Sequence, residues 1–213
     1  MHIPDGILPL PMTVGGYVVS AATAWYCIHK IKQRGDPHEQ IPKAALLAAA
    51  FFTASLIHIP IPPASVHLVL GGLLGAVLGY FAFPAILVAL FFQAVMFGHG
   101  GLTTLGVNGV ILGLPSLLSA MIFRWQAHQP HPTPARTALF GFAAGAIATA
   151  ISASLFVLFL YNTIPAHLDA TAERSAIITL GLLHVPVAII EGIVTAMVTL
   201  FLQKTRPQLL QGL

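Results

Sequence analysis

The sequence predicts an all-α membrane protein, a polytopic helical bundle with about seven transmembrane helices. Of its 213 residues, 57% are hydrophobic and only 7% are charged, whereas a soluble domain carries about 25% charged residues. The hydrophobic residues are gathered in long blocks that are separated by short polar or proline-rich breaks. So few charges cannot cover a soluble domain of this size, and blocks of this length suit a hydrocarbon core that needs about 20 apolar residues per helix.

The apolar blocks define seven expected spans within one integral-membrane domain, residues 1–213. The third and fourth spans are short and their boundary near Pro84 is soft, so tilt, partial burial or re-entry of these segments stays open. A loop at 1–11 precedes the bundle at 12–203, and a tail at 204–213 follows it. The spans are expected at about 12–31, 43–58, 67–82, 84–98, 105–124, 136–161 and 176–203.

The distribution of basic residues predicts the orientation. With seven spans and the N-terminus outside, eight of the nine lysines and arginines lie at or beside inner segments, and only Arg174 does not. Positive residues favour the cytoplasmic side, so we expect a multi-pass protein with an outer N-terminus and a cytoplasmic C-terminus. The net charge of +3 is too small to suggest a nucleic-acid partner. Pro4, Asp5 and Gly6 interrupt the start, and no basic segment precedes them, so we expect no cleaved signal peptide.

Small residues recur at a spacing of four in the second and third spans. This spacing lets helices approach closely in lipid. Two interpretations stay open, namely packing within the chain and a docking face for a partner membrane protein. The residues are Gly71, Gly75 and Gly79 in the third span, and Ala44 with Ala48 and Ala45 with Ala49 in the second.

The first two residues, Met1 and His2, can form a metal chelate. The bulky His2 disfavours removal of Met1, so we expect a free amine at residue 1. This amine, the His2 backbone nitrogen and the His2 imidazole can bind one metal in fused five- and six-membered rings. A metal that displaces the amide proton favours a plane with one position left for another imidazole, and planar nitrogen sites suit Ni(II) or Cu(II).

Further polar residues are expected near the same outer face. His67 is a ligand or an interfacial histidine, and His58 is an entry ligand or a helix-end residue. Contacts to a ligating imidazole are expected on physical grounds, and the candidates for them are Ser65, His99 and Asn108.

Two carboxylates complete the set of candidates. Asp5 is expected to cap or brace the N-terminal loop through backbone hydrogen bonds. Glu191 lies in the middle of a span, where a carboxylate is costly and usually functional or paired, and a structural hydrogen bond is its expected role.

The chain lacks the motifs of the obvious enzyme classes. It has no Gly-x-x-x-x-Gly-Lys-Ser/Thr phosphate loop, so we expect no ATP hydrolysis by this chain. His-Glu-x-x-His is also absent, which argues against a membrane zinc protease. We therefore expect no enzymatic activity, and energy for transport would have to come from other subunits.

Four segments together resemble one transporter family. They are Met-His-Ile-Pro-Asp-Gly at 1–6, Ser-Val-His at 65–67, Phe-Gly-His-Gly-Gly-Leu-Thr-Thr-Leu-Gly-Val-Asn at 97–108, and His-Val-Pro-Val-Ala-Ile-Ile-Glu-Gly at 184–192. This pattern resembles the CbiM/NikM family, the substrate-binding membrane subunits (S components) of energy-coupling-factor nickel and cobalt importers. The resemblance covers nearly the whole chain.

The resemblance implies a metal site and a set of partners. It implies that residues 1–11 fold back into the bundle and that the Met1 amine, the His2 amide and imidazole, and the His67 imidazole bind Ni²⁺ or Co²⁺ as substrate, with no organic cofactor. It also implies a coupling transmembrane (T) subunit, a pair of ABC-type ATPases and a small companion membrane subunit, in a prokaryotic inner membrane. Cobalt members often have Ser-His-Pro where this chain has Val66-His67-Leu68, which favours nickel.

Two other functions remain open at this point. A haem-binding membrane electron carrier would use histidines such as His58, His67 and His184 as axial ligands, although these lie near span ends. A permease for a non-metal solute would leave the histidines incidental.

Overall fold

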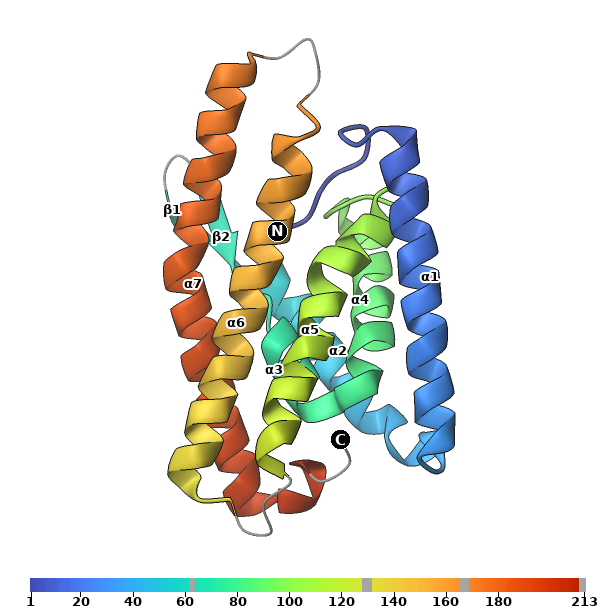
Figure 1. Ribbon diagram of the computed structural model, residues 1–213, viewed down its shortest axis with the longest axis vertical. Helices are drawn as coiled ribbons and strands as arrows, with labels where there is room; N and C mark the ends of the chain where they lie inside the picture. The colour runs from blue at the N-terminus through green and yellow to red at the C-terminus, as the bar shows by residue number, and fades with distance from the viewer. Residues whose placement is uncertain (62–63, 128–131, 165–168, 211–213) are drawn as a thin grey trace.

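The computed structural model describes residues 1–61, 64–127, 132–164 and 169–210, and only the backbone of residues 58–61, 64–66 and 127. Its α-helices form one elongated bundle, and the first residues of the chain lie among the helices (Figure 1). Short 3-10 turns follow α1, α3 and α7. The helices are α1 (Leu10–Gln33), α2 (Ile41–Leu56), α3 (Gly71–Leu78), α4 (Ala82–Phe97), α5 (Leu105–Ala127), α6 (Pro134–Tyr161) and α7 (Ala170–Thr205).

Several helical runs are suited to a bilayer. Within the described ranges, four are long and apolar enough to cross a membrane: Gly71–Phe97, which joins α3 and α4, Leu105–Gln126, Pro134–Tyr161 and Ala170–Thr205. The predicted helical membrane class is therefore confirmed in its main features. Seven crossings and the sides on which the termini lie stay predictions.

Capping residues explain where the last two helices begin. Thr133 accepts a hydrogen bond from the Arg136 N–H (3.4 Å) at the start of α6. Asp169 accepts from the N–H groups of Thr171 (2.8 Å) and Ala172 (3.3 Å). Such caps satisfy N–H groups that have no partner within the helix. Helix α7 therefore begins at Ala170, about six residues before the apolar block suggested.

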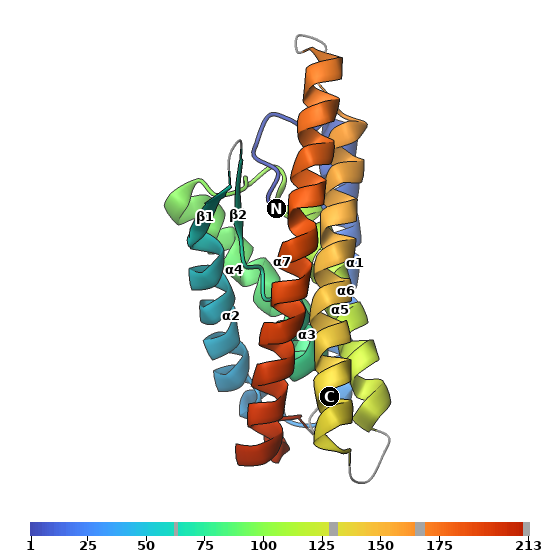
Figure 2. The same cartoon turned by 90° about the vertical axis from the view of Figure 1, so that its left-hand side faces the viewer.

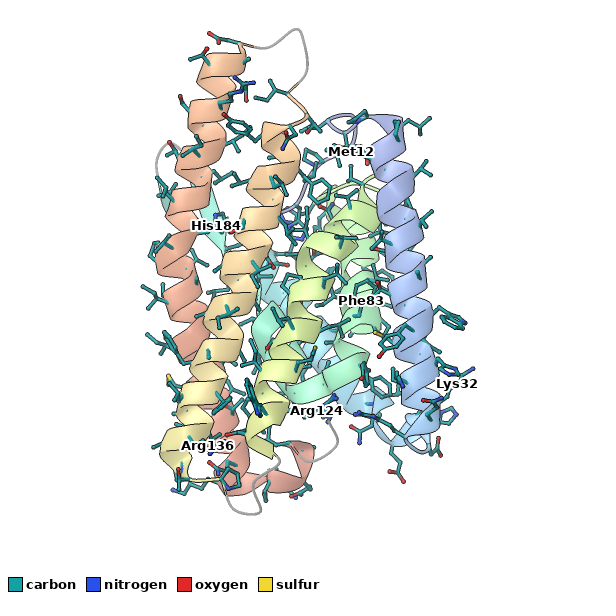
Figure 3. The ribbon with its side chains drawn as sticks, viewed as in Figure 1. Met12, Lys32, Phe83, Arg124, Arg136 and His184 are labelled. Atoms are coloured by element: carbon teal, nitrogen blue, oxygen red, sulfur yellow. The ribbon has the colours of Figure 1, made fainter. Side chains whose placement is uncertain are left out.

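Basic side chains gather at one end of the bundle. Lys32, Arg124 and Arg136 lie at the end opposite Met12, from α1, α5 and α6 respectively (Figure 3). The orientation predicted from the sequence requires such a cluster at the cytoplasmic end.

The region around 58–70 differs from the expectation. In the break between the expected spans 43–58 and 67–82, strands β1 (His58–Ile61) and β2 (Ala64–His67) form an antiparallel hairpin in which His58 pairs with His67. Figure 2 shows the hairpin beside α7, above α2. The second helix thus ends at Leu56 rather than near 58.

The third helix is shorter than predicted at both ends, because it runs from Gly71 to Leu78 rather than from about 67 to 82. Leu70 has a left-handed backbone conformation (φ 55°), which costs energy for a residue with a Cβ. The Glu191 carboxylate on α7 accepts hydrogen bonds from the N–H groups of Val69 and Leu70, the latter at 2.8 Å. These bonds stabilise an extended approach to α3 in place of another helical turn.

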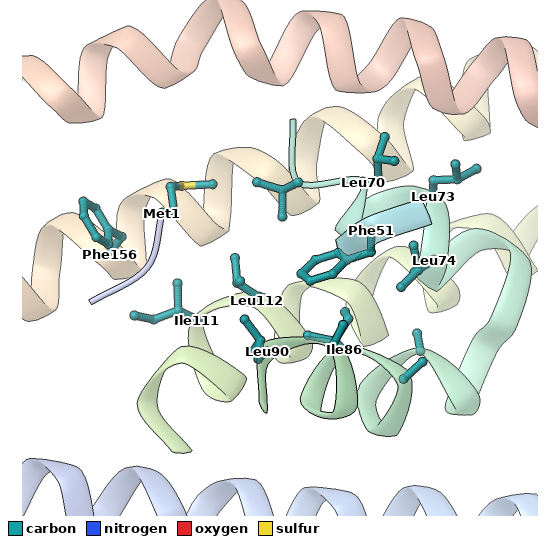
Figure 4. Close-up of a cluster of buried hydrophobic side chains, with 14 of the residues drawn as sticks. Met1, Phe51, Leu70, Leu73, Leu74, Ile86, Leu90, Ile111, Leu112 and Phe156 are labelled. Atoms are coloured by element: carbon teal, nitrogen blue, oxygen red, sulfur yellow. The ribbon is translucent and has the colours of Figure 1, made fainter. Parts of the chain in front are cut away.

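The short helix α3 lies in the centre of the bundle, and all of its residues are buried. A Cβ at Gly75 would overlap the Ser116 carbonyl on α5, and one at Gly72 would overlap Gly145 on α6. The glycines of this segment therefore serve close packing within the chain. Figure 4 shows the adjoining apolar cluster, which includes Met1, Leu112 and Phe156.

The alanines of α2 divide between two environments. Ala44 and Ala48 are half-buried and pack against the core cluster, whereas Ala45 and Ala49 are exposed. Only the second pair is therefore available on the surface of this chain for a partner.

Candidate metal centre

Residue 3 anchors the N-terminal segment inside the bundle. Ile3 is fully buried, and its N–H donates to Asn108 Oδ1 on α5 (2.9 Å). Its carbonyl accepts from Asn108 Nδ2 (3.0 Å) and from the Thr104 hydroxyl (2.6 Å). Because both backbone groups of Ile3 are satisfied by side chains, the two residues before it are held at a fixed place.

Asp5 provides a second anchor, at the start of α5. Its carboxylate accepts from the Thr103 hydroxyl (2.5 Å) and from the N–H groups of Leu102 (3.1 Å), Thr103 (2.9 Å) and Thr104 (3.3 Å). These bonds, the Thr103 hydroxyl first, lower the pKa of Asp5. Asp5 thus braces the 102–104 loop rather than the backbone of its own loop. A Cβ at Gly101 would overlap the carboxylate, so this position requires glycine.

Nitrogen atoms from three segments meet at the buried N-terminus. The Met1 amine lies 2.8 Å from His67 Nε2, at the end of β2. Ring centroids are separated by 5.3 Å between His2 and His67, by 4.3 Å between His2 and His99, and by 5.5 Å between His67 and His99. Each of the three imidazoles offers a nitrogen within 4.8 Å of the other two.

Burial disfavours the protonated forms of the Met1 amine and of the His2 imidazole. Burial lowers the pKa of the Met1 amine from 8.0 to about 5. Burial, followed by the positive charges of the amine, His99 and His67, lowers the pKa of His2 well below its usual value. Both ring nitrogens of His2 are buried without a hydrogen-bond partner. Buried polar atoms of this kind require an explanation, and coordination of a metal ion would supply one.

The orientation of the His67 ring follows from its neighbours. Its Nδ1 lies 3.2 Å from the Leu68 carbonyl, which can only accept a hydrogen bond. Nδ1 therefore carries the proton, and Nε2 directs its lone pair toward the Met1 amine. The Glu191 bonds to Val69 and Leu70 hold the chain directly after His67.

The structure assigns the remaining predicted residues to different places. His99 lies in the cluster, whereas the hydrogen bonds of Asn108 go to Ile3 and Thr104 rather than to an imidazole. Glu191 makes the structural bonds expected of it. The side chains of His58 and Ser65 lie outside the described part of the chain.

Sequence reasoning missed two contributors, Thr104 and Gln93. Thr104 binds the Ile3 carbonyl, and Gln93 is a fully buried amide on α4 whose backbone carbonyl accepts from the His99 N–H (3.1 Å). An isolated amide in an otherwise apolar helix was the available signal for Gln93.

Comparisons with known proteins identify a family. The model of the CbiM family, described as the cobalt uptake substrate-specific transmembrane region, matches residues 2–209. A Haemophilus influenzae protein named for metal transport is 33% identical, over 99% of this chain and 97% of its own. The fused nickel transport protein NikMN of Rhodobacter capsulatus is 31% identical, over 99% of this chain and 64% of its own.

A solved structure shares the fold. The crystal structure of a truncated transition metal transporter superimposes with a TM-score of 0.73, covering 96% of this chain and 99% of that chain at 23% identity.

Proposed function

The chain belongs to the CbiM family of cobalt uptake substrate-specific transmembrane regions, and from this premise we propose that it captures a divalent transition-metal ion, nickel in preference to cobalt, and carries it across the membrane. The observation that supports this best is the meeting of the Met1 amine, His2 and His67 inside the bundle. The membership also favours a metal ion over the haem and non-metal solutes considered above.

The proposed ligands are the Met1 amine, the His2 amide nitrogen, the His2 imidazole Nδ1 and His67 Nε2. Neighbouring ligands of a square plane with metal–nitrogen bonds of about 2.0 Å lie about 2.8 Å apart. The Met1 amine and His67 Nε2 are neighbours in this arrangement, and their separation is 2.8 Å. Little movement of these two atoms is therefore needed to bind the ion.

Partner subunits supply the energy in this proposal. They are a coupling transmembrane subunit, a pair of ABC-type ATPases and a small companion membrane subunit, which together with this S component form an energy-coupling-factor importer in a prokaryotic inner membrane. The relative named as a fused NikMN protein is longer than this chain, which spans 64% of it. Its name and its additional length support a companion subunit. Ala45 and Ala49, exposed on α2, are the proposed docking face for the coupling subunit.

The orientation belongs to the same proposal. Seven crossings place the N-terminal metal centre toward the outer face and the cluster of basic side chains, which includes Arg124 and Arg136 (Figure 3), toward the cytoplasm. The ion then enters from outside, and movement driven by ATP hydrolysis in the partners exposes it to the inside.

One added residue tests the chelate. A protein purified with a single glycine before Met1 keeps every side chain but moves the amine away, and it is compared with protein processed to begin at Met1. We expect Ni(II) affinity to fall by more than the roughly 10–100-fold that loss of an outer contact costs. Unchanged affinity in an isothermal titration would rule out the proposed ligand set.

The fourth ligand is tested by a matched pair of histidines. His67→Ala should abolish tight Ni(II) binding. His184→Ala should not, because His184 is equally buried on α7 but its ring binds the Leu180 carbonyl (2.7 Å) outside the cluster. Equal losses in both variants would show that general destabilisation is the cause. Competition between Ni(II) and Co(II) on the unmodified protein measures the preference.

A further inference from the structure

Gln93 is a fully buried amide whose two ends are distinguished by their partners. Nε2 donates to the Ser55 Oγ and to the Phe52 carbonyl (3.4 Å), both on α2. The Ser55 hydroxyl itself donates to the Phe52 carbonyl (3.0 Å), so its oxygen can only accept from Gln93. The network therefore fixes the amide with its NH2 group toward α2.

The carbonyl end of this amide is left without a donor. Gln93 Oε1 is buried and has no hydrogen-bond partner. Its backbone carbonyl binds the His99 N–H, and the His99 ring lies 4.3 Å from that of His2. Gln93 thus lies beside the histidine cluster, in which both ring nitrogens of His2 also lack partners.

The electrostatics of His2 agree with this juxtaposition. Burial is the largest influence on the pKa of His2 and lowers it, whereas the Gln93 side chain acts in the opposite sense. A hydrogen-bond acceptor that faces an imidazole has this effect because it stabilises the protonated ring nitrogen. Because the NH2 group is held toward α2, the unpartnered Oε1 is the end of Gln93 that is left for His2.

We infer that Gln93 is a positioning residue for the metal site, whose Oε1 accepts the Nε2–H of His2. This inference rests on the proposed function. A six-membered ring that includes the His2 amide nitrogen closes through Nδ1, so the proton of the neutral imidazole must reside on Nε2. Histidine ligands almost always donate their second N–H to an acceptor, which fixes the tautomer and the ring orientation. The paired donor and acceptor would satisfy two buried groups at once.

Two substitutions and a matched control test this role. Gln93→Met removes the acceptor at similar size, and Gln93→Glu keeps it. Gln126→Met is the control, because Gln126 on α5 is also buried with an unpartnered Oε1. We expect Gln93→Met to weaken Ni(II) binding by about 10–100-fold. Gln126→Met should stay close to the unmodified protein, and Gln93→Glu should weaken Ni(II) binding less than Gln93→Met does, because it keeps the acceptor.

A spectroscopic measurement separates positioning from general stability. Square-planar Ni(II) is diamagnetic, so the His2 Nε2–H of the loaded, ¹⁵N-histidine-labelled protein is observable by NMR. A carboxylate forms a shorter, stronger hydrogen bond than an amide. The signal should therefore move downfield in Gln93→Glu and should exchange faster with water in Gln93→Met.

The outcomes are distinguishable. Absence of Ni(II) binding by the unmodified protein would overturn the proposed function, and this inference with it. Normal binding by Gln93→Met, or an equal loss in Gln126→Met, would overturn only the role of Gln93. If Gln93→Met does not fold, an unshifted Nε2–H in Gln93→Glu would overturn that role as well.

Discussion

Replacing Glu191 should uncouple His67 from the rest of the bundle. The carboxylate is fully buried and accepts the N–H groups of Val69 and Leu70. In Glu191→Leu both N–H groups lose their acceptor. Each buried, unpaired group costs about 1–3 kcal/mol, so the native path of this segment becomes less favourable by about 2–6 kcal/mol. The chain avoids this cost by releasing residues 67–70, and with them the His67 imidazole.

The same free energy sets the expected loss of affinity. Metal binding must restore the displaced segment, and each 1.4 kcal/mol corresponds to a factor of ten. A cost of about 2 kcal/mol therefore predicts at least a roughly 30-fold weaker Ni(II) affinity. Glu191→Gln should weaken Ni(II) binding less. Its single carbonyl oxygen can still accept from the two N–H groups that share Oε1 in the unmodified protein.

Two measurements on purified protein check this reasoning. Ni(II) titration gives the affinity, and hydrogen exchange reports the protection of the Val69 and Leu70 amides. Glu173→Gln, in the first turn of the same helix, is the control and should change neither. If Glu191→Leu binds Ni(II) normally while those amides exchange faster, then His67 does not depend on this anchor. Unchanged exchange would show that the hydrogen bonds contribute little.

Two further predictions concern the N-terminal segment. Ni(II) affinity should rise about tenfold per pH unit between pH 7 and 9. In this window the Met1 amine, with a pKa of about 5, and ordinary imidazoles are already deprotonated, so binding releases only the His2 amide proton. A slope near zero in pH-dependent titrations would exclude amide ligation, and a slope approaching two below pH 8 would show an amine of ordinary pKa. Gly101→Ala should displace the Asp5 carboxylate and weaken Ni(II) binding by about 10–100-fold. Gly15→Ala, where a Cβ meets open space, should not; equal effects in titrations of the two variants would contradict the anchoring role of Asp5.

The sequence predicted helices well where a long apolar block decides the structure. Helices α5 and α6 begin and end within about three residues of the expected positions, because lipid leaves an apolar backbone few alternatives to the helix. The error was larger at α3. There a carboxylate more than 100 residues away in the sequence fixes the chain path, and hydropathy carries no information about such a partner. The proline-rich break between the expected second and third spans also forms a short hairpin, which hydropathy does not predict.

The candidate site was predictable in its residue types but not in its supports. The chelating capacity of Met1 and His2 follows from covalent connectivity alone, and His67 followed from the family resemblance. The clamp on Ile3 by Asn108 and Thr104 could not be predicted, because it uses side chains that are common at helix starts. The partners of Gln93 depend on how α2 packs against α4, which no local pattern encodes.

The long-range anchoring of the first residues has a consequence for biosynthesis. Met1 contacts His67, Ile3 binds Asn108, and Asp5 binds residues 102–104. Ile3 and Asp5 therefore have no partners until the start of α5 has been made and inserted. A chain that stops before this point holds the chelating end but neither of its anchors. Synthesis of residues 1–108 thus precedes the assembly of the proposed metal site.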